Sequence, residues 1–204
     1  MASELQIGAG RPQVIYRLES ILERLNLAAL FPRSQPLEVE LGSGDGSFLL
    51  EYAARHPERN FIAVERLLGR LRKLERKGQR AALTNLRGLR IESSYFLGYL
   101  LPPQAAAALH VYFPDPWPKR RHQRHRLINE RFPTLASQAL APGGVVYLRT
   151  DDQPYFEQMA GVFCANPSFR LVATPAELAA IQTDFERDFN ARGIETLRAA
   201  YQRE

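Results

Sequence analysis

Apolar positions along the chain follow two different periods. Short apolar runs resemble buried strands, and between them apolar side chains recur every three or four residues, as in amphipathic helices. The predicted strands are 37–41, 60–65, 86–91, 107–113, 145–149, 169–173 and 195–202. The predicted helices are 47–56, 67–79, 128–140, 155–164 and 183–191, with a short helix or loop at 95–101. Because strands that alternate with helices imply βαβ units, we expect an α/β fold with a seven-stranded, mostly parallel sheet and helices on both faces.

The N-terminal residues precede this alternation. Residues 1–13 have no apolar periodicity and contain two glycines and a proline, which predicts a flexible tail. Apolar residues recur at helical spacing from Leu18 to Leu25, which predicts an amphipathic helix that ends before Pro32. The sequence contains no repeat or interdomain linker, so we expect residues 14–204 to form a single domain against which this helix packs.

Two local signals mark element boundaries in the C-terminal half. Ala141-Pro142-Gly143-Gly144 predicts a turn before the fifth strand. Thr174-Pro175-Ala176-Glu177 has the form of a capping box with proline at the first helical position, and it predicts a short helix.

Composition narrows the class of protein. The chain has 204 residues and a formal net charge of +5, which mildly favours a polyanionic partner. No apolar run approaches the ~20 residues that span a bilayer, and the N-terminus lacks a signal-peptide pattern, so we expect a cytoplasmic protein without membrane contact. Cys164 is the sole cysteine, which excludes an intrachain disulfide. We expect it to be a buried, inert thiol. The four histidines lack suitable partners in sequence, so we expect no metal.

A glycine-rich turn, Glu40-Leu41-Gly42-Ser43-Gly44-Asp45-Gly46, follows the first predicted strand. Ligands of open α/β sheets bind at this edge, but the G-x-G-x-G spacing departs from the dinucleotide fingerprint G-x-G-x-x-G. Glu40 would repel a pyrophosphate, and Glu65 ends the second strand, where a carboxylate can accept both ribose hydroxyls. The pair favours a nucleoside cofactor without phosphates, S-adenosylmethionine, over NAD. The alternative is a structural turn and a surface glutamate.

The segment Phe113-Pro114-Asp115-Pro116-Trp117 follows the fourth predicted strand. Each proline fixes its own φ and restricts the residue before it, so Asp115 has little backbone freedom. A carboxylate held in this way suits the positioning of one ligand. The alternative is an ordinary surface loop, because proline and aspartate are common in turns.

Two basic clusters accompany these motifs. The first lies between residues 119 and 126, and because it adjoins Asp115 we expect it to contact nucleic-acid phosphates. Its members are Lys119, Arg120, Arg121, Arg124 and Arg126, with His122 and His125 among them. The second is a stripe on the helix after Glu65, for which a solvated face is the favoured interpretation. Its members are Arg66, Arg70, Lys73, Lys77 and Arg80.

Taken together, these motifs resemble the bacterial tRNA (guanine-N7)-methyltransferase family from about Leu37 to the C-terminus. Members of that family use S-adenosylmethionine to methylate N7 of the variable-loop guanine, position 46 of tRNA. The resemblance therefore implies a Rossmann-like class I methyltransferase fold and a tRNA substrate. The motifs that carry it are Glu40-x-Gly42-x-Gly44-x-Gly46, Glu65, Phe113-Pro114-Asp115-Pro116-Trp117-Pro118-Lys119, Thr150-Asp151 and Thr183-Asp184-Phe185-Glu186.

The resemblance also implies roles for individual residues. The implied cofactor-binding residues are Glu40, Gly42, Gly44, Glu65, Glu92 and Asp115, and Asp115 is also the implied catalytic residue. Glu92 stands where the family commonly has aspartate, and Asp188 stands where it usually has arginine or lysine. The implied substrate-binding residues are Lys119, Asp151, Thr183, Asp184, Phe185 and Glu186.

Guanine N7 already carries an in-plane lone pair, so no base need deprotonate it before methylation. We expect Asp115 to orient the guanine edge and to stabilise the positive charge that develops on the base. Alternatives that the sequence leaves open are methylation of another RNA, a small-molecule or protein substrate, an NAD-dependent dehydrogenase, and a non-enzymatic RNA-binding module. A monomer and a homodimer are equally compatible with the sequence.

Overall fold

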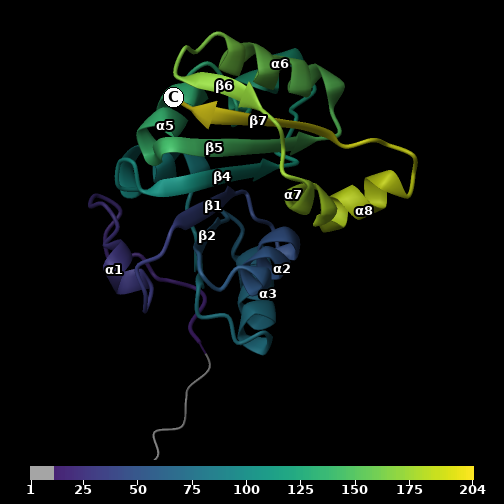
Figure 1. Cartoon of the computed structure of the whole chain (residues 1–204). Coiled ribbons are helices and arrows are strands. Elements are labelled where there is room, and N and C mark those ends of the chain that lie inside the picture. Colours follow the sequence, from purple (N-terminus) through teal and green to yellow (C-terminus); the bar gives the residue numbers. More distant parts are fainter. Residues whose placement is uncertain (1–11) are drawn as a thin grey trace, which may run out of the picture.

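The computed structural model describes residues 12–204 and contains one seven-stranded sheet with helices on both faces (Figure 1). The strand order is β3-β2-β1-β4-β5-β7-β6, in which β7 is antiparallel to both of its neighbours and the other pairs are parallel. The predicted α/β fold and seven-stranded, mostly parallel sheet are therefore confirmed. The strands are β1 Leu37–Leu41, β2 Asn60–Val64, β3 Leu86–Leu89, β4 Ala106–Tyr112, β5 Leu140–Thr150, β6 Phe169–Val172 and β7 Leu197–Arg203.

Helices cover the two faces of this sheet in separate layers. Apolar side chains of α5, α6 and a π-helix at Phe96–Leu100 pack on one face, and those of α2, α3 and α7 pack on the other. In Figure 1, α7 and α8 lie beyond the carboxyl ends of β4 and β5. The helices are α1 Leu27–Leu30, α2 Ser47–Arg55, α3 Leu68–Arg80, α4 Ser93–Tyr95, α5 Phe132–Ala139, α6 Gln153–Cys164, α7 Ala176–Ala180 and α8 Asp184–Asn190.

The predicted N-terminal amphipathic helix is wrong. Residues 12–26 form no helix; instead Ile15 bridges to Gly88 beside β3, with backbone bonds from Tyr16 N to Gly88 O at 2.9 Å and from Gly88 N to Val14 O at 2.8 Å. Short helices are marginal without packing, so pairing to the sheet edge prevails here. Leu22, one of the residues expected to pack inward, is 85% exposed. Most of the predicted tail at 1–13 lies outside the described residues.

Three other boundaries also differ from the predictions. The turn predicted at 141–144 is a bulge inside β5, because β4 pairs Ala106 with Leu140 and Ala108 with Val145. The helix predicted at 128–140 is α5, which begins at Phe132, four residues after its predicted start. Pro175, with no side-chain hydrogen bond, caps α7, so the Thr174 capping box does not form.

Cys164 is exposed at the end of α6, contrary to the expected buried thiol. Within residues 12–204, no helix has the length and apolar character needed to cross a bilayer.

Candidate active site

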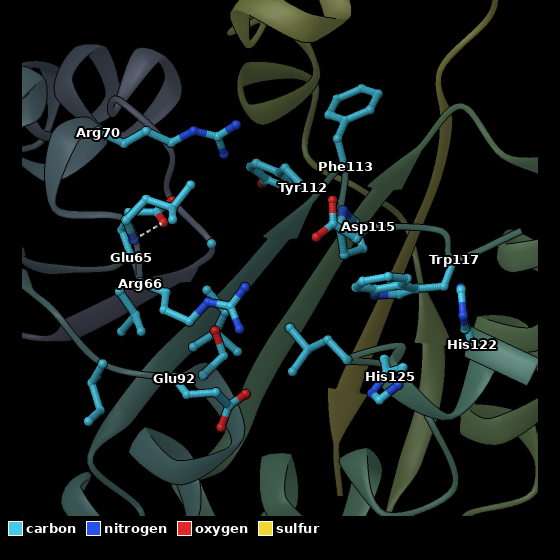
Figure 2. Close-up of a pocket in the computed structure, with 18 residues that line it drawn as sticks. Glu65, Arg66, Arg70, Glu92, Tyr112, Phe113, Asp115, Trp117, His122 and His125 are labelled. Carbon is cyan, nitrogen blue, oxygen red and sulfur yellow. Dashed lines mark hydrogen bonds between the residues drawn. The ribbon is translucent and has the colours of Figure 1, made fainter.

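The carboxyl ends of β1, β2 and β4 border a cavity of about 570 Å³ (Figure 2). Figure 2 shows Glu65, Arg66 and Arg70 on one side of it, and Asp115 and Trp117 on the other. This is the edge at which open α/β sheets bind ligands, and the volume suits a small molecule. Two motifs that lie far apart in sequence therefore meet at one cavity.

The glycine turn is joined to the end of β2. Gly42 N and Ser43 N donate to Val64 O at 2.9 and 3.0 Å, and Gly44 N donates to Glu65 Oε2 at 3.0 Å. Gly46 has φ +80°, and a Cβ at this position would lie 2.8 Å from Leu74 Cδ1, so only glycine fits without a shift. The turn therefore brings its backbone close to the cavity, and Gly42 forms part of the wall.

Glu65 is buried in the cavity wall with one backbone donor on each oxygen. Besides the bond from Gly44, Oε1 accepts from Leu67 N at 2.7 Å. A carboxylate oxygen has a second acceptor direction, so both oxygens can still accept from a ligand. The structure thus fits the predicted role of Glu65 as an acceptor for two hydroxyls.

Glu40 lies behind the cavity wall and does not line the cavity. Its side chain is buried, and Oε2 has no hydrogen-bond partner among residues 12–204. Burial raises the pKa of Glu40 to about 8; the nearby charges of Glu65 and Asp45 add to the rise, and Arg149 opposes it. The turn therefore covers a carboxyl group that lacks a compensating donor.

Glu92 lies at the cavity edge and caps α4. Its Oε1 accepts from Ser94 N at 2.9 Å and its Oε2 from Tyr95 N at 2.7 Å. The side chain is exposed and lines the cavity. Glu92 therefore lies at the cavity, and both of its oxygens accept hydrogen bonds from the start of α4.

The Asp115 loop is strained at both ends. Phe113 has φ +50° and Trp117 has φ +44°, a region that bulky side chains rarely adopt and that costs about 1–3 kcal/mol per residue. Phe113 N donates to Arg149 O at 2.8 Å, and Arg126 Nε donates to Pro116 O at 2.6 Å. Asp115, exposed between these anchors, lines the cavity, into which its carboxylate points in Figure 2.

Aromatic side chains border Asp115 on two sides. Trp117 packs against His122 and His125, with ring centroids 5.8 and 5.4 Å apart, and all three line the cavity. On the other side, the Phe113 ring lies 5.8 Å from Phe189 and 6.4 Å from Phe185 of α8. No pattern in the sequence indicated a contact between Phe113 and α8.

Burial divides the basic run at 119–126 into two groups. Lys119, Arg120, Arg121 and Arg124 are exposed on or beside a 3-10 helix at Arg120–His125. Arg126 is instead buried; it bonds Pro116 O and the Gln158 side chain, and its guanidinium lies 4.6 Å from the Tyr155 ring centroid. Arg126 therefore holds the Asp115 loop, and it is wrong to count it among the exposed basic residues.

The predicted basic stripe of α3 is also divided. Arg66 and Arg70 line the cavity, whereas Lys77 Nζ forms an ion pair with Asp45 Oδ2 at 2.7 Å. Part of the stripe therefore belongs to the site, and part holds the glycine turn.

The late block at Thr183–Glu186 contributes both exposed and buried groups. Thr183 Oγ1 caps α8 by accepting from Glu186 N at 3.0 Å, and Asp184 and Phe185 are exposed. Glu186 is fully buried, with Oε2 2.9 Å from Arg149 Nη1 and Oε1 bonded to Arg198. In this arrangement the Glu186 carboxylate cannot reach a substrate, and it fixes α8 instead.

Arg149 is a buried residue beside the site, and the sequence pattern did not single it out. Its guanidinium, buried over the Tyr112 ring at 4.2 Å, donates to Ile181 O at 2.7 Å and to Leu178 O. The sequence feature that could have identified Arg149 is its position as the one charged residue at the end of the apolar run 145–149. Arg149 connects the Asp115 loop to α8, because its backbone oxygen accepts from Phe113 N.

None of the six predicted substrate residues, Lys119 and Asp151 included, is part of the cavity lining. Lys119 is exposed beside the Asp115 loop, and Asp151 is half-buried between β5 and α6. Within residues 12–204, no three carboxylate, histidine or cysteine side chains are grouped as metal ligands.

Comparison with known proteins agrees with this geometry. A family model described as "Putative methyltransferase" matches residues 34–199. The chain is similar to the tRNA (guanine-N(7)-)-methyltransferase of Streptomyces coelicolor, at 41% identity over 71% of this chain and 54% of that protein. It is similar to the protein of the same name from Nitrosomonas eutropha, at 35% identity over 76% of this chain and 68% of that protein. The solved structure of the 16S rRNA methyltransferase KamB superposes with a TM-score of 0.65 at 16% identity, covering 89% of this chain and 95% of that one.

The fold and the family match define a Rossmann-like methyltransferase. Within that class, the chain belongs to the tRNA (guanine-N(7)-)-methyltransferase family, as the resemblance of its motifs predicted. The chain spans little more than half the length of the Streptomyces relative.

Proposed function

We propose that this protein uses S-adenosylmethionine to methylate N7 of the variable-loop guanine of tRNA, in the cytoplasm. The observation that carries the proposal is the Asp115 carboxylate, which points into the cavity opposite Glu65. Family membership supports the reaction type, and the exposed Lys119, Arg120, Arg121 and Arg124 beside the cavity support a polyanionic substrate.

The residues of the cavity fit S-adenosylmethionine better than NAD. Glu65 offers an acceptor to each of two ribose hydroxyls, and Leu41, Val64 and Ile91 give the cavity an apolar wall for a purine. Glu40, Asp45 and Glu65 gather three carboxyl groups near the turn, where a pyrophosphate would have to sit. The unpartnered Glu40 oxygen favours a cofactor with a cationic group on this side. When bound, S-adenosylmethionine supplies an electrophilic methyl group.

We infer that Asp115 acts on the guanine and not on the methyl group. Its carboxylate can accept from the N1–H and N2–H₂ edge of the base, which fixes the orientation of N7. N7 uses its own lone pair, so Asp115 need not remove a proton. As N7 is alkylated the purine becomes cationic, and the fixed negative charge of Asp115 stabilises it.

The block at Thr183–Glu186 supports the substrate side from two positions. Asp184 and Phe185 are exposed and so are accessible to RNA, and the buried Glu186 positions the helix that carries them. Trp117, His122 and His125 offer aromatic faces on which a base can stack beside Asp115.

The test is transfer of a labelled methyl group to unmodified tRNA, followed by cleavage chemistry that is specific for 7-methylguanine. We expect label in the tRNA and strand scission in the variable loop. Label without scission would contradict N7 of guanine as the acceptor, and absence of label would contradict the tRNA substrate.

A further inference from the structure

A second concave surface lies on the far side of α3 from the glycine turn. This groove has a volume of about 470 Å³, and its lining includes Arg17, Arg72 and Arg90 together with Tyr16 and Glu75. The three arginines are exposed, and within residues 12–204 none of them forms an ion pair with a carboxylate. Three guanidinium groups against one carboxylate make the groove positive.

The fold holds the walls of this groove in place. The bridge between Ile15 and Gly88 fixes the N-terminal segment, and Val14 packs against α3 at Gly78, where a Cβ would lie 3.0 Å from Val14 Cγ2. A Cβ on Gly88 would lie 2.8 Å from Leu71 Cδ1, so glycine permits close packing of α3 on β3. The segment that replaces the predicted N-terminal helix is therefore one wall of a built groove.

The groove and the active-site cavity share a wall. Arg90 lines the groove, and its Nε donates to the backbone oxygen of Arg66, which lines the cavity, at 3.3 Å. Leu67 faces the cavity, and the next residue, Leu68, faces the groove. A chain of phosphates leaving the cavity past Arg66 and Arg70 would reach the groove next.

We infer that the groove of Arg17, Arg72 and Arg90 binds the phosphate backbone of the tRNA substrate at a distance from the methylated base. The inference rests on the proposed function. Guanidinium forks match the geometry of phosphate oxygens, and the continuity with the cavity favours RNA over a separate anionic protein. The groove contributes affinity and fixes the position of the tRNA on the protein, while Asp115 and its neighbours select the base.

The test compares two charge reversals on the same helix. Arg72→Glu places an acid in the groove, and Arg76→Glu places one on an exposed part of α3 that does not line it. Binding of unmodified tRNA is measured by filter binding over a series of salt concentrations, and methyl transfer is assayed separately. We expect Arg72→Glu to weaken tRNA binding at least about tenfold, Arg76→Glu to weaken it less than about threefold, and Arg72→Ala to lower the salt slope by about one.

The outcomes separate the groove from the reaction. Equal losses in Arg72→Glu and Arg76→Glu would overturn the groove, because they would reflect only the overall charge of α3. Wild-type protein that binds tRNA without methylating it would contradict the proposed function. The tRNA affinities of the two variants would still show whether the groove binds the tRNA backbone. Absence of tRNA binding by the wild type would overturn both proposals.

Discussion

Both motifs that meet at the cavity contain residues with positive φ, but one motif uses glycines and the other uses bulky residues. The turn after β1 reaches positive φ at Gly42, Gly44 and Gly46, where glycine adopts it readily. The loop after β4 reaches positive φ at Phe113 and Trp117, where it is strained. The side of the cavity formed by the glycine turn is therefore specified by local sequence, whereas the side formed by the Asp115 loop depends on tertiary contacts that hold a strained loop.

Those contacts form a connected support behind Asp115. The Arg149 backbone holds Phe113, the Arg149 side chain holds Glu186, and Phe185 and Phe189 of α8 pack on the Phe113 ring. Strain near a catalytic group persists only where its surroundings over-determine it. We therefore expect the Asp115 side of the cavity to be the more sensitive to distant substitutions.

The largest effect is expected for Glu186→Met. This change leaves Arg149 buried without its carboxylate partner and should lower the free energy of unfolding by about 3–5 kcal/mol in urea titrations. The double variant Arg149→Met/Glu186→Met should recover most of that loss, because it removes the unpaired charge. Arg198, whose side chain is 30% exposed, can reach water in both variants. If the double variant were as unstable as the single one, the ion pair would not be the element that holds α8.

Asp115→Asn should have the next largest effect. The amide keeps the shape of the side chain but loses the charge that supports a cationic purine, so we expect kcat to fall about 100-fold, with the Kd for S-adenosylmethionine within about twofold. Single-turnover methylation of tRNA measures the first quantity, and calorimetry the second. Asp188→Asn, an exposed change on α8, is the matched control and should keep full activity. Wild-type turnover by Asp115→Asn would sink the assigned role.

Gly46→Ala tests the glycine side of the comparison. An alanine must hold φ near +80° and its Cβ meets Leu74, so we expect a loss of about 2 kcal/mol in unfolding free energy. Gly69→Ala, in α3 with open space around it, should instead stabilise by about 0.5–1 kcal/mol. Equal results for the two glycines would show that the turn does not depend on positive φ.

The same contrast explains how much of the site could be predicted from sequence. The glycine turn, Glu65 and the helix predicted at 183–191 depend on neighbours in the chain or on strand ends, and the structure has them close to where the patterns placed them. The burial of Arg126 and Glu186 depends on partners tens of residues away, so an exposed and a buried charge look alike in sequence. The N-terminal helix failed for the same reason, since its competitor was the backbone of Gly88.

The remaining prediction concerns the pH dependence that Glu40 confers. Its pKa of about 8 in the folded protein exceeds the usual 4.5, so the folded state keeps a proton that the unfolded state releases. The stability that this proton contributes is fully present below pH 4.5 and is lost as the pH rises towards 8. Glu40→Gln cannot ionise, so in urea titrations its unfolding free energy should rise relative to wild type between pH 5 and 8, by roughly 3–4 kcal/mol if the whole pKa shift is expressed.

The exposed Glu19→Gln controls for loss of a carboxylate and should show no such trend. Glu40→Gln should also weaken the binding of S-adenosylmethionine, because a carboxyl group that can ionise is lost close behind the cavity wall, although Glu40 does not line the cavity. If Glu40→Gln is more stable than wild type at pH 8 but binds the cofactor more weakly, then the Glu40 carboxyl group lowers the stability of the fold and strengthens cofactor binding. A pH-independent difference between Glu40→Gln and wild type would show that the carboxyl group is not held neutral behind the turn.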